Sequence, residues 1–183
     1  ISQGEAAMQG ITGLPQAQIS EQCGQLTGML GSQIDAVSLS SQGEAEAGMR
    51  SFALDTGIPP ADLAATARVC LAVGYRQDDM RMAVGSALLL SSMGEAAYGE
   101  LLGHHLLEGF GTTTRRDLAA EWYNASLPAI ENGAAPAFMP GQPERVQLLR
   151  AASERLSGNT MAPAPIPAST GTGTALPTFT VNQ

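Results

Sequence analysis

The chain has 183 residues, which is enough for one folded domain, and 44% of them are hydrophobic, which is enough for an apolar core. Aromatic residues make up only 4% while Ala, Gly, Leu and Met are plentiful, so the composition predicts an all-α fold. The net charge of −8 without any lysine argues against nucleic acid as a partner, and no apolar run approaches the roughly 20 residues of a transmembrane helix.

Three regions differ in their patterns. Residues 1–13 show no sustained period and are predicted to form an N-terminal arm. Residues 14–157 carry helical patterns and are predicted to form one helical domain, whereas 158–183 are predicted to form an extended C-terminal tail. The chain begins at Ile1 rather than Met, and a cleaved signal peptide is one explanation among several.

Within the domain the helices are predicted in chain order. Pro15 suits a first helical turn, so a helix is expected to run to about Leu30, and the serine-rich stretch 32–42 is predicted as a loop with one turn of helix. Further helices are predicted from about residue 43 to 54, 58 to 75, 78 to 93 and 143 to 156. Pro128 is expected to end or kink the helix that carries Trp122.

The two cysteines, Cys23 and Cys70, each share a helical stripe with apolar residues and are expected to face the interior. If their helices are neighbours they can form a disulfide, which the loop-entropy estimate values at about 4 kcal/mol. Two buried free thiols in a cytosolic protein are the alternative, and the residues alone favour neither.

The stretch 96–126 is predicted to form a helical hairpin. Apolar residues recur at i, i+3 and i+4 spacing through its first half, and Gly109 and Gly111 supply the turn. Three threonines after the turn offer hydroxyl caps for the second helix, which carries Trp122 and Tyr123. Small residues on both helices would let the two axes approach closely.

Seven residues of this hairpin stand at a fixed spacing: Leu102, Gly103, Gly109, Gly111, Ala119, Trp122 and Tyr123. In this spacing the hairpin resembles the Sel-one-like repeat, a branch of the tetratricopeptide superfamily with the approximate pattern LG-x2-Y-x2-G-x-G, a short turn, then A-x2-WY. The chain departs from that pattern at Leu106, which replaces a tyrosine, and at Arg115, which replaces the turn aspartate. Ser126 and Leu127 replace its late alanine pair.

The resemblance implies a short α-solenoid of antiparallel helix pairs that scaffolds multi-subunit assemblies. It covers about one sixth of the chain. An offset of about 37 residues places Gly74 over Gly111 and Ala83 over Ala120, so further repeats would be degenerate.

The tail changes character after Gly158, because it has no charged side chain and is rich in Pro, Thr, Ala and Gly. Such a segment has too little apolar surface to fold alone and is most simply ordered by lying on a partner protein, with its own domain as the alternative surface. The anchors are expected to be Ile166, Leu176, Phe179 and Val181.

The strongest catalytic-looking group is Glu100, His104 and Glu108, at i, i+4 and i+8 of one helix. Two carboxylates and an imidazole can hold a divalent metal, but a solvated acidic face is the favoured interpretation because no second ligand cluster occurs. His105 falls on the apolar stripe and is predicted to be a satisfied interior or interface residue rather than a ligand. There is no nucleophile elbow and no phosphate-binding loop, so we predict no enzyme, no catalytic or metal site and no cofactor.

These patterns together predict a non-catalytic protein-protein interaction scaffold, as an accessory subunit of a larger bacterial assembly on the periplasmic side of a membrane. Its partners are expected to be proteins. A periplasmic regulator that binds a sensor, and a virion or appendage component, are the alternative hypotheses. An exported location is favoured over a cytoplasmic one, and the absence of lysine suits a GC-rich genome.

Overall fold

The computed structural model describes residues 15–138, 142 and 144–158, and every element in that part of the chain is a helix. The all-α class is therefore confirmed for the described residues, and none of their helices combines the length and apolarity needed to cross a bilayer. The predicted arm over 1–13 and the tail anchors Ile166, Leu176, Phe179 and Val181 lie outside the described residues.

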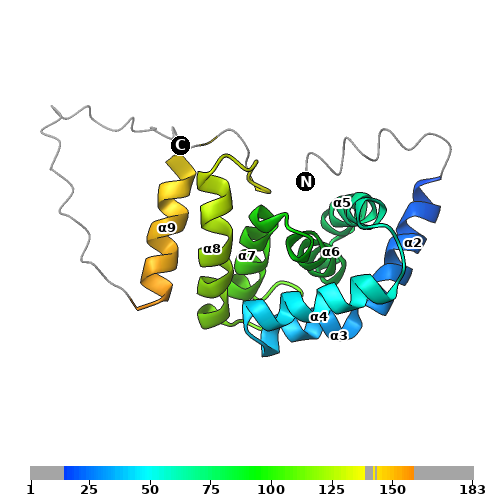
Figure 1. Ribbon diagram of the computed structural model, residues 1–183, viewed down its shortest axis with the longest axis horizontal. Coiled ribbons are helices and arrows are strands. Elements are labelled where there is room, and N and C mark those ends of the chain that lie inside the picture. Colours follow the sequence, from blue (N-terminus) through cyan, green and yellow to red (C-terminus); the bar gives the residue numbers. More distant parts are fainter. Residues whose placement is uncertain (1–14, 139–141, 143, 159–183) are drawn as a thin grey trace, which may run out of the picture.

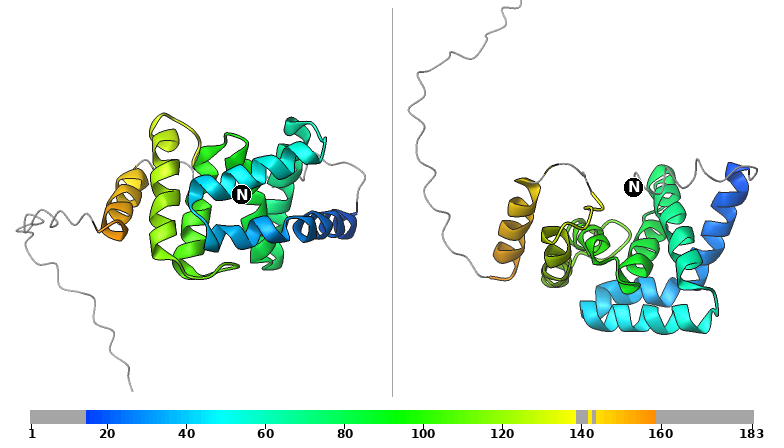
Figure 2. Two further views of the ribbon diagram at one scale, coloured as in Figure 1. Left: turned by 60° about the horizontal axis from the view of Figure 1, so that its bottom comes forward. Right: turned by 45° about the horizontal axis from the view of Figure 1, so that its top comes forward.

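The chain runs from α2 at one end of the molecule to α9 at the other (Figure 1). The elements are α2 (Gln16–Met29), α3 (Gly31–Leu39), α4 (Gln42–Asp55), α5 (Pro60–Gln77), α6 (Met80–Ser92), the 3₁₀ turn η1 (Ala96–Tyr98), α7 (Gly99–Glu108), α8 (Arg116–Glu131) and α9 (Glu144–Leu156). Helices α7, α8 and α9 stand in a row, and α3 and α4 cross the N-terminal half on one side (Figures 1 and 2).

Helix α6 forms the centre of the N-terminal half. It packs against α2, α3, α4, α5, η1 and α7, and every residue from Met82 to Ser92 is buried. A helix that is apolar all round has no solvent face, so its neighbours must surround it. Two of its buried serines have hydrogen-bond partners, since the Ser91 hydroxyl donates to the Glu46 carboxylate of α4 at 2.7 Å and the Ser92 hydroxyl donates to the Leu89 carbonyl at 2.8 Å.

Helices α2 and α5 are joined covalently. Cys23 and Cys70 are both buried, and a disulfide links them across 47 residues of sequence. The structure thus pairs the two cysteines, a choice that the sequence left open. Closing a loop of this length removes unfolded-state entropy worth about 4 kcal/mol.

Helices α7 and α8 approach closely at their small residues. A Cβ added at Gly103 would overlap the Tyr123 ring, and one added at Gly99 would lie 3.3 Å from the Trp122 indole. The predicted close approach of the two axes is confirmed. Trp122 is fully buried, and its indole nitrogen has no hydrogen-bond partner among the described residues.

The predicted loop over 32–42 is wrong, and of the two outcomes predicted at Pro128 the end of the helix is wrong while the kink stays a prediction. Residues Gly31–Leu39 form the helix α3 rather than a loop, because Ile34 and Val37 are buried against the central helix. Helix α8 runs through Pro128 to Glu131, because Leu127 and Ile130 on either side of the proline are buried and Pro128 itself is exposed. Burial of two large aliphatic side chains offsets the roughly 3 kcal/mol of an interior proline.

The predicted threonine caps are also wrong. Arg115 occupies the N-cap position of α8, where no side chain caps the first turn. The Thr112 hydroxyl instead donates to the His105 carbonyl of α7 at 2.8 Å.

Candidate functional site

The turn between α7 and α8 is a rigid connector between distant parts of the chain. Gly109 ends α7 with φ +78°, and Gly111 has φ +71°, conformations that favour glycine. A Cβ at Gly111 would lie 2.7 Å from the Met80 carbonyl carbon, so only glycine lets the turn rest on the start of α6.

Hydrogen bonds tie the same turn to α3. The Thr113 N–H donates to the Ser38 hydroxyl oxygen at 3.0 Å, and the Arg115 guanidinium donates to the Ser38 carbonyl at 2.8 Å. The Arg115 N–H also donates to the Leu106 carbonyl at 2.9 Å. Two of these bonds use backbone N–H groups of the turn and one uses the Arg115 side chain, so the turn is held from both α3 and α7.

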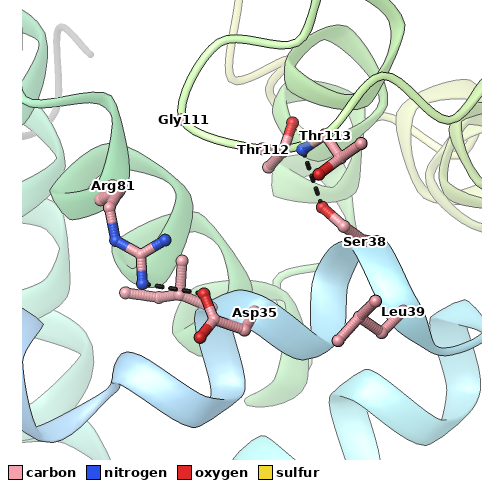
Figure 3. Close-up of a pocket in the computed structure, with 8 residues that line it drawn as sticks. Asp35, Ser38, Leu39, Arg81, Gly111, Thr112 and Thr113 are labelled. Carbon is pink, nitrogen blue, oxygen red and sulfur yellow. Dashed lines mark hydrogen bonds and ion pairs between the residues drawn. The ribbon is translucent and has the colours of Figure 1, made fainter.

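A first hollow of about 510 Å³ lies between α3, α6 and this turn (Figure 3). Its polar wall carries the Arg81–Asp35 ion pair at 2.9 Å, which is half-exposed and contributes at most about 1 kcal/mol. Figure 3 shows Thr112 and Thr113 facing α3 across the hollow, with Leu39 at its edge. The Leu39 side chain is 77% exposed.

A second hollow of about 320 Å³ lies next to the contact between the turn and the start of α6. Met80 of α6 and Phe110 of the turn both line it. Its wall is mostly apolar, and it is lined by Tyr75, Met80, Leu101, His104, His105, Glu108, Phe110 and Phe138. Phe110 is 59% and Phe138 38% exposed, which is high for aromatic side chains. We call this the aromatic hollow.

His105 forms part of the floor of the aromatic hollow. Its Nδ1 donates to the Phe110 carbonyl at 2.6 Å, so in the neutral ring Nε2 accepts from the Tyr75 hydroxyl at 2.7 Å. Burial lowers the pKa of His105 and raises the pKa of Tyr75 to about 12, although the Phe110 carbonyl acts in the opposite direction on His105. Both groups are therefore neutral near pH 7. The prediction of a satisfied interior histidine is confirmed.

The second histidine, whose side chain is 39% exposed, joins a polar network around the buried Glu100. His104 Nε2 lies 3.2 Å from a Glu100 carboxylate oxygen, and its Nδ1 lies 2.8 Å from the Tyr123 hydroxyl. The Arg145 guanidinium of α9 forms an ion pair with the same Glu100 carboxylate. Burial lowers the pKa of His104, opposed by the charge of Glu108. Desolvation also lowers the pKa of Arg145.

The prediction of a solvated acidic face is wrong for Glu100, which is fully buried. The neighbouring arginine explains the difference, because a carboxylate can be buried when a cation and further hydrogen bonds replace its water. Glu108, two turns later, is exposed as predicted. Glu100 and His104 are thus paired while Glu108 lies outside the pair, and no group of His, Cys, Asp or Glu side chains in the described residues is arranged to hold a metal ion.

The residues predicted from repeat spacing have packing positions. Leu102, Ala119, Trp122 and Tyr123 are buried, Gly103 contacts the Tyr123 ring, and the two turn glycines have the conformations given above.

The residues that sequence reasoning missed are Tyr75, Phe138 and Arg145. Tyr75 was assigned only to its helix, and Phe138 and Arg145 come from a linker and a last helix that carried no site prediction. The sequence did contain one signal for Arg145. Glu100 lies on a helix rich in apolar residues, and a carboxylate that is buried there needs a cation from another element.

Comparisons with protein-family models, with curated proteins and with solved structures find no match to this chain. The resemblance to the Sel-one-like repeat therefore stays a prediction.

Proposed function

We propose that this protein is a non-catalytic interaction module that binds other proteins as an accessory subunit of a larger assembly. One observation carries the proposal: the rigid turn after α7 holds Phe110 exposed at the rim of a mostly apolar hollow, with exposed Phe138 beside it. Exposed apolar side chains that gather around a concavity are typical of binding surfaces.

The turn that presents Phe110 supports this function. It is fixed by backbone contacts to α3, α6 and α7, so Phe110 needs little ordering when a partner arrives. Less conformational entropy is then lost on binding. The two hollows near this turn give a partner both an apolar and a polar surface to contact.

An oxidising compartment is part of the proposal. The Cys23–Cys70 disulfide supports it, because such bonds persist outside the reducing cytosol. A periplasmic location in a bacterium, beside a membrane complex, fits this chemistry. Mass spectrometry of protein isolated under non-reducing conditions tests it: a bonded pair is expected, and two alkylatable thiols would remove the main support.

We also propose that the C-terminal half has repeat-like helical packing. The row of α7, α8 and α9 supports this, since α8 packs against both of its neighbours in sequence. The contact of Gly103 with Tyr123 uses two residues of the Sel-one-like pattern. Helix α6, with six packing neighbours, is more enclosed than a repeat helix that touches only adjacent units.

Affinity purification from the source cells tests the proposed function. A tagged protein should retain one set of partner proteins at fixed stoichiometry through washes in roughly 1 M salt, which screen surface charge pairs. Recovery of the tagged chain alone, from both soluble and detergent-extracted fractions, would contradict the proposal.

The regulator hypothesis remains as a second candidate, because the aromatic hollow is small enough for a reversible contact. Its distinguishing result is release of the partner when the cells receive a stress signal. A fixed subunit, including one of a virion or an appendage, would stay bound under the same treatment.

A further inference from the structure

The aromatic hollow has an electrostatic character that the net charge of the chain alone does not explain. His104 and His105 both have lowered pKa values through burial, so neither ring contributes a positive charge near pH 7. Among the described lining residues, Glu108 is the group that is charged at this pH. The hollow therefore carries the Glu108 carboxylate beside a mostly apolar wall, and the Arg145 guanidinium next to Phe138 is already paired with Glu100.

Glu108 is available to a ligand. Its side chain is exposed, and it forms no salt bridge with a described residue. The Glu100 carboxylate, two helical turns earlier, is instead paired with Arg145 and His104. A carboxylate at the rim of an apolar cavity attracts a cation whose own stem is apolar, because water is displaced from both surfaces.

The aromatic rings favour the same kind of ligand. The Arg145 guanidinium already lies over the Phe138 ring, 4.9 Å from its centroid, which shows that this ring accepts a guanidinium on one face. Phe110 and Tyr75 line the same hollow. A planar guanidinium stacks on such rings and also reaches a carboxylate, a combination that a compact ammonium matches less well.

We propose that the aromatic hollow binds an arginine side chain from a partner protein, with its aliphatic stem against Met80 and Leu101 and its guanidinium at Glu108. This inference rests on the proposed interaction function and names the chemistry of the partner. The charge of −8 on the whole chain adds long-range attraction for a basic segment. The volume of about 320 Å³ accommodates one large side chain with space for part of its neighbour.

The test uses n-hexylguanidinium as the probe and n-hexylurea as its neutral, nearly isosteric control. The full chain is labelled with ¹³C on the methionine methyl groups, because Met80 lines the hollow while Met82 is buried in α6. Hexylguanidinium should move the Met80 methyl resonance in a saturable titration and leave the Met82 resonance in place. Hexylurea should bind about fivefold to tenfold more weakly, in line with one surface ion pair and one cation–π contact.

A matched pair of variants isolates the carboxylate. Glu108→Gln should weaken hexylguanidinium binding about fivefold and leave hexylurea binding unchanged. Glu154→Gln, which removes another exposed carboxylate, on α9 and outside the lining of the hollow, should change neither. The hexylurea titration shows that the Glu108→Gln hollow keeps its shape.

Three results would overturn the inference: equal affinity for hexylguanidinium and hexylurea, no effect of Glu108→Gln on their ratio, or a Met80 resonance that no probe moves. None of these bears on whether the protein has partners. If partners co-purify but the probes do not bind as expected, the proposed function stands and the partners bind to a surface other than the aromatic hollow. Guanidinium binding without any co-purifying protein would contradict the proposed function alone.

Discussion

Each half of the molecule is stabilised by a different kind of interaction. Helices α2 to α5 surround the apolar central helix α6, and α2 and α5 carry the disulfide, whereas α9 is attached to the α7–α8 pair by a network that includes a fully buried carboxylate. Apolar packing loses stability gradually as atoms are removed. A buried charge network fails abruptly, because removing one member leaves the others unpaired in a low-dielectric interior.

The difference between the two halves also bears on the aromatic hollow, the proposed binding site. The aromatic hollow lies where the two halves meet, with Tyr75 and Met80 from the N-terminal half and the histidines of α7 from the other. His104 belongs both to the hollow and to the network that binds α9. We therefore expect the shape of the hollow to depend on the polar network that holds His104.

Removing Arg145 should have the largest effect. Arg145→Met leaves Glu100 buried without its cation, so the free energy of unfolding should fall by about 3–5 kcal/mol, measured by urea denaturation. The double variant Glu100→Leu with Arg145→Met should recover most of this loss, because it removes both charges. Equal stability of the single and double variants would contradict a network held by charge.

Removing the disulfide tests the other half. Cys23→Ser with Cys70→Ser should lower the free energy of unfolding by about 4 kcal/mol, because the unfolded chain regains the entropy of a long loop. The Met80 methyl resonance should stay in its wild-type position. A displaced Met80 resonance in the folded double variant would show that the hollow depends on the N-terminal half after all.

The contact between α7 and α8 gives a smaller effect. Gly103→Ala places a methyl group into the Tyr123 ring and should lower the free energy of unfolding by about 1–3 kcal/mol. Gly24→Ala is the matched control, because its added methyl meets no atom within 4 Å on helix α2 and should raise stability by about 0.5–1 kcal/mol. Thermal unfolding followed by circular dichroism measures both, and similar signs for the two variants would contradict the packing role of Gly103.

Acidification should give the smallest effect. Burial holds the pKa of His105 below its ordinary value of 6.5, so below about pH 6.5 the unfolded chain binds a proton that the native chain does not. Stability is thus complete above pH 6.5 and falls as the pH is lowered toward the native pKa. Urea midpoints at pH 7.5 and 5.5 should differ less in His105→Gln than in the wild type, and an unchanged difference would contradict the neutral buried ring.

Local patterns predicted most of the helices. Pro60 as the first residue of α5, the Asp79 side chain that accepts from the Met82 N–H, and the two positive-φ glycines after α7 are all short-range signals, and the structure has each of them. The signature Ser41-x-x-Glu44, a capping box at the start of α4, was equally available in the sequence.

Long-range contacts explain what the sequence did not predict. Helix α3 forms in a serine-rich stretch because Ile34 and Val37 are buried against α6, and its last turn is held by hydrogen bonds from Thr113 and Arg115, more than 70 residues later, to Ser38. The burial of Glu100 depends on Arg145, 45 residues away, and the aromatic hollow needs Phe138 from a linker with no pattern of its own. A local sequence period cannot contain such long-range pairings. Tertiary packing therefore determines helix α3, the burial of Glu100 and the aromatic hollow.

Photo-crosslinking in the intact source cells tests the proposed binding face most directly. A benzoylphenylalanine at Phe110, on the rim of the hollow, is compared with one at Leu54, which is 79% exposed on α4. We predict that position 110 captures one partner protein, in lower yield when Glu108→Gln is also present, and that position 54 captures none. Equal capture from both positions, or none from position 110, would contradict the account.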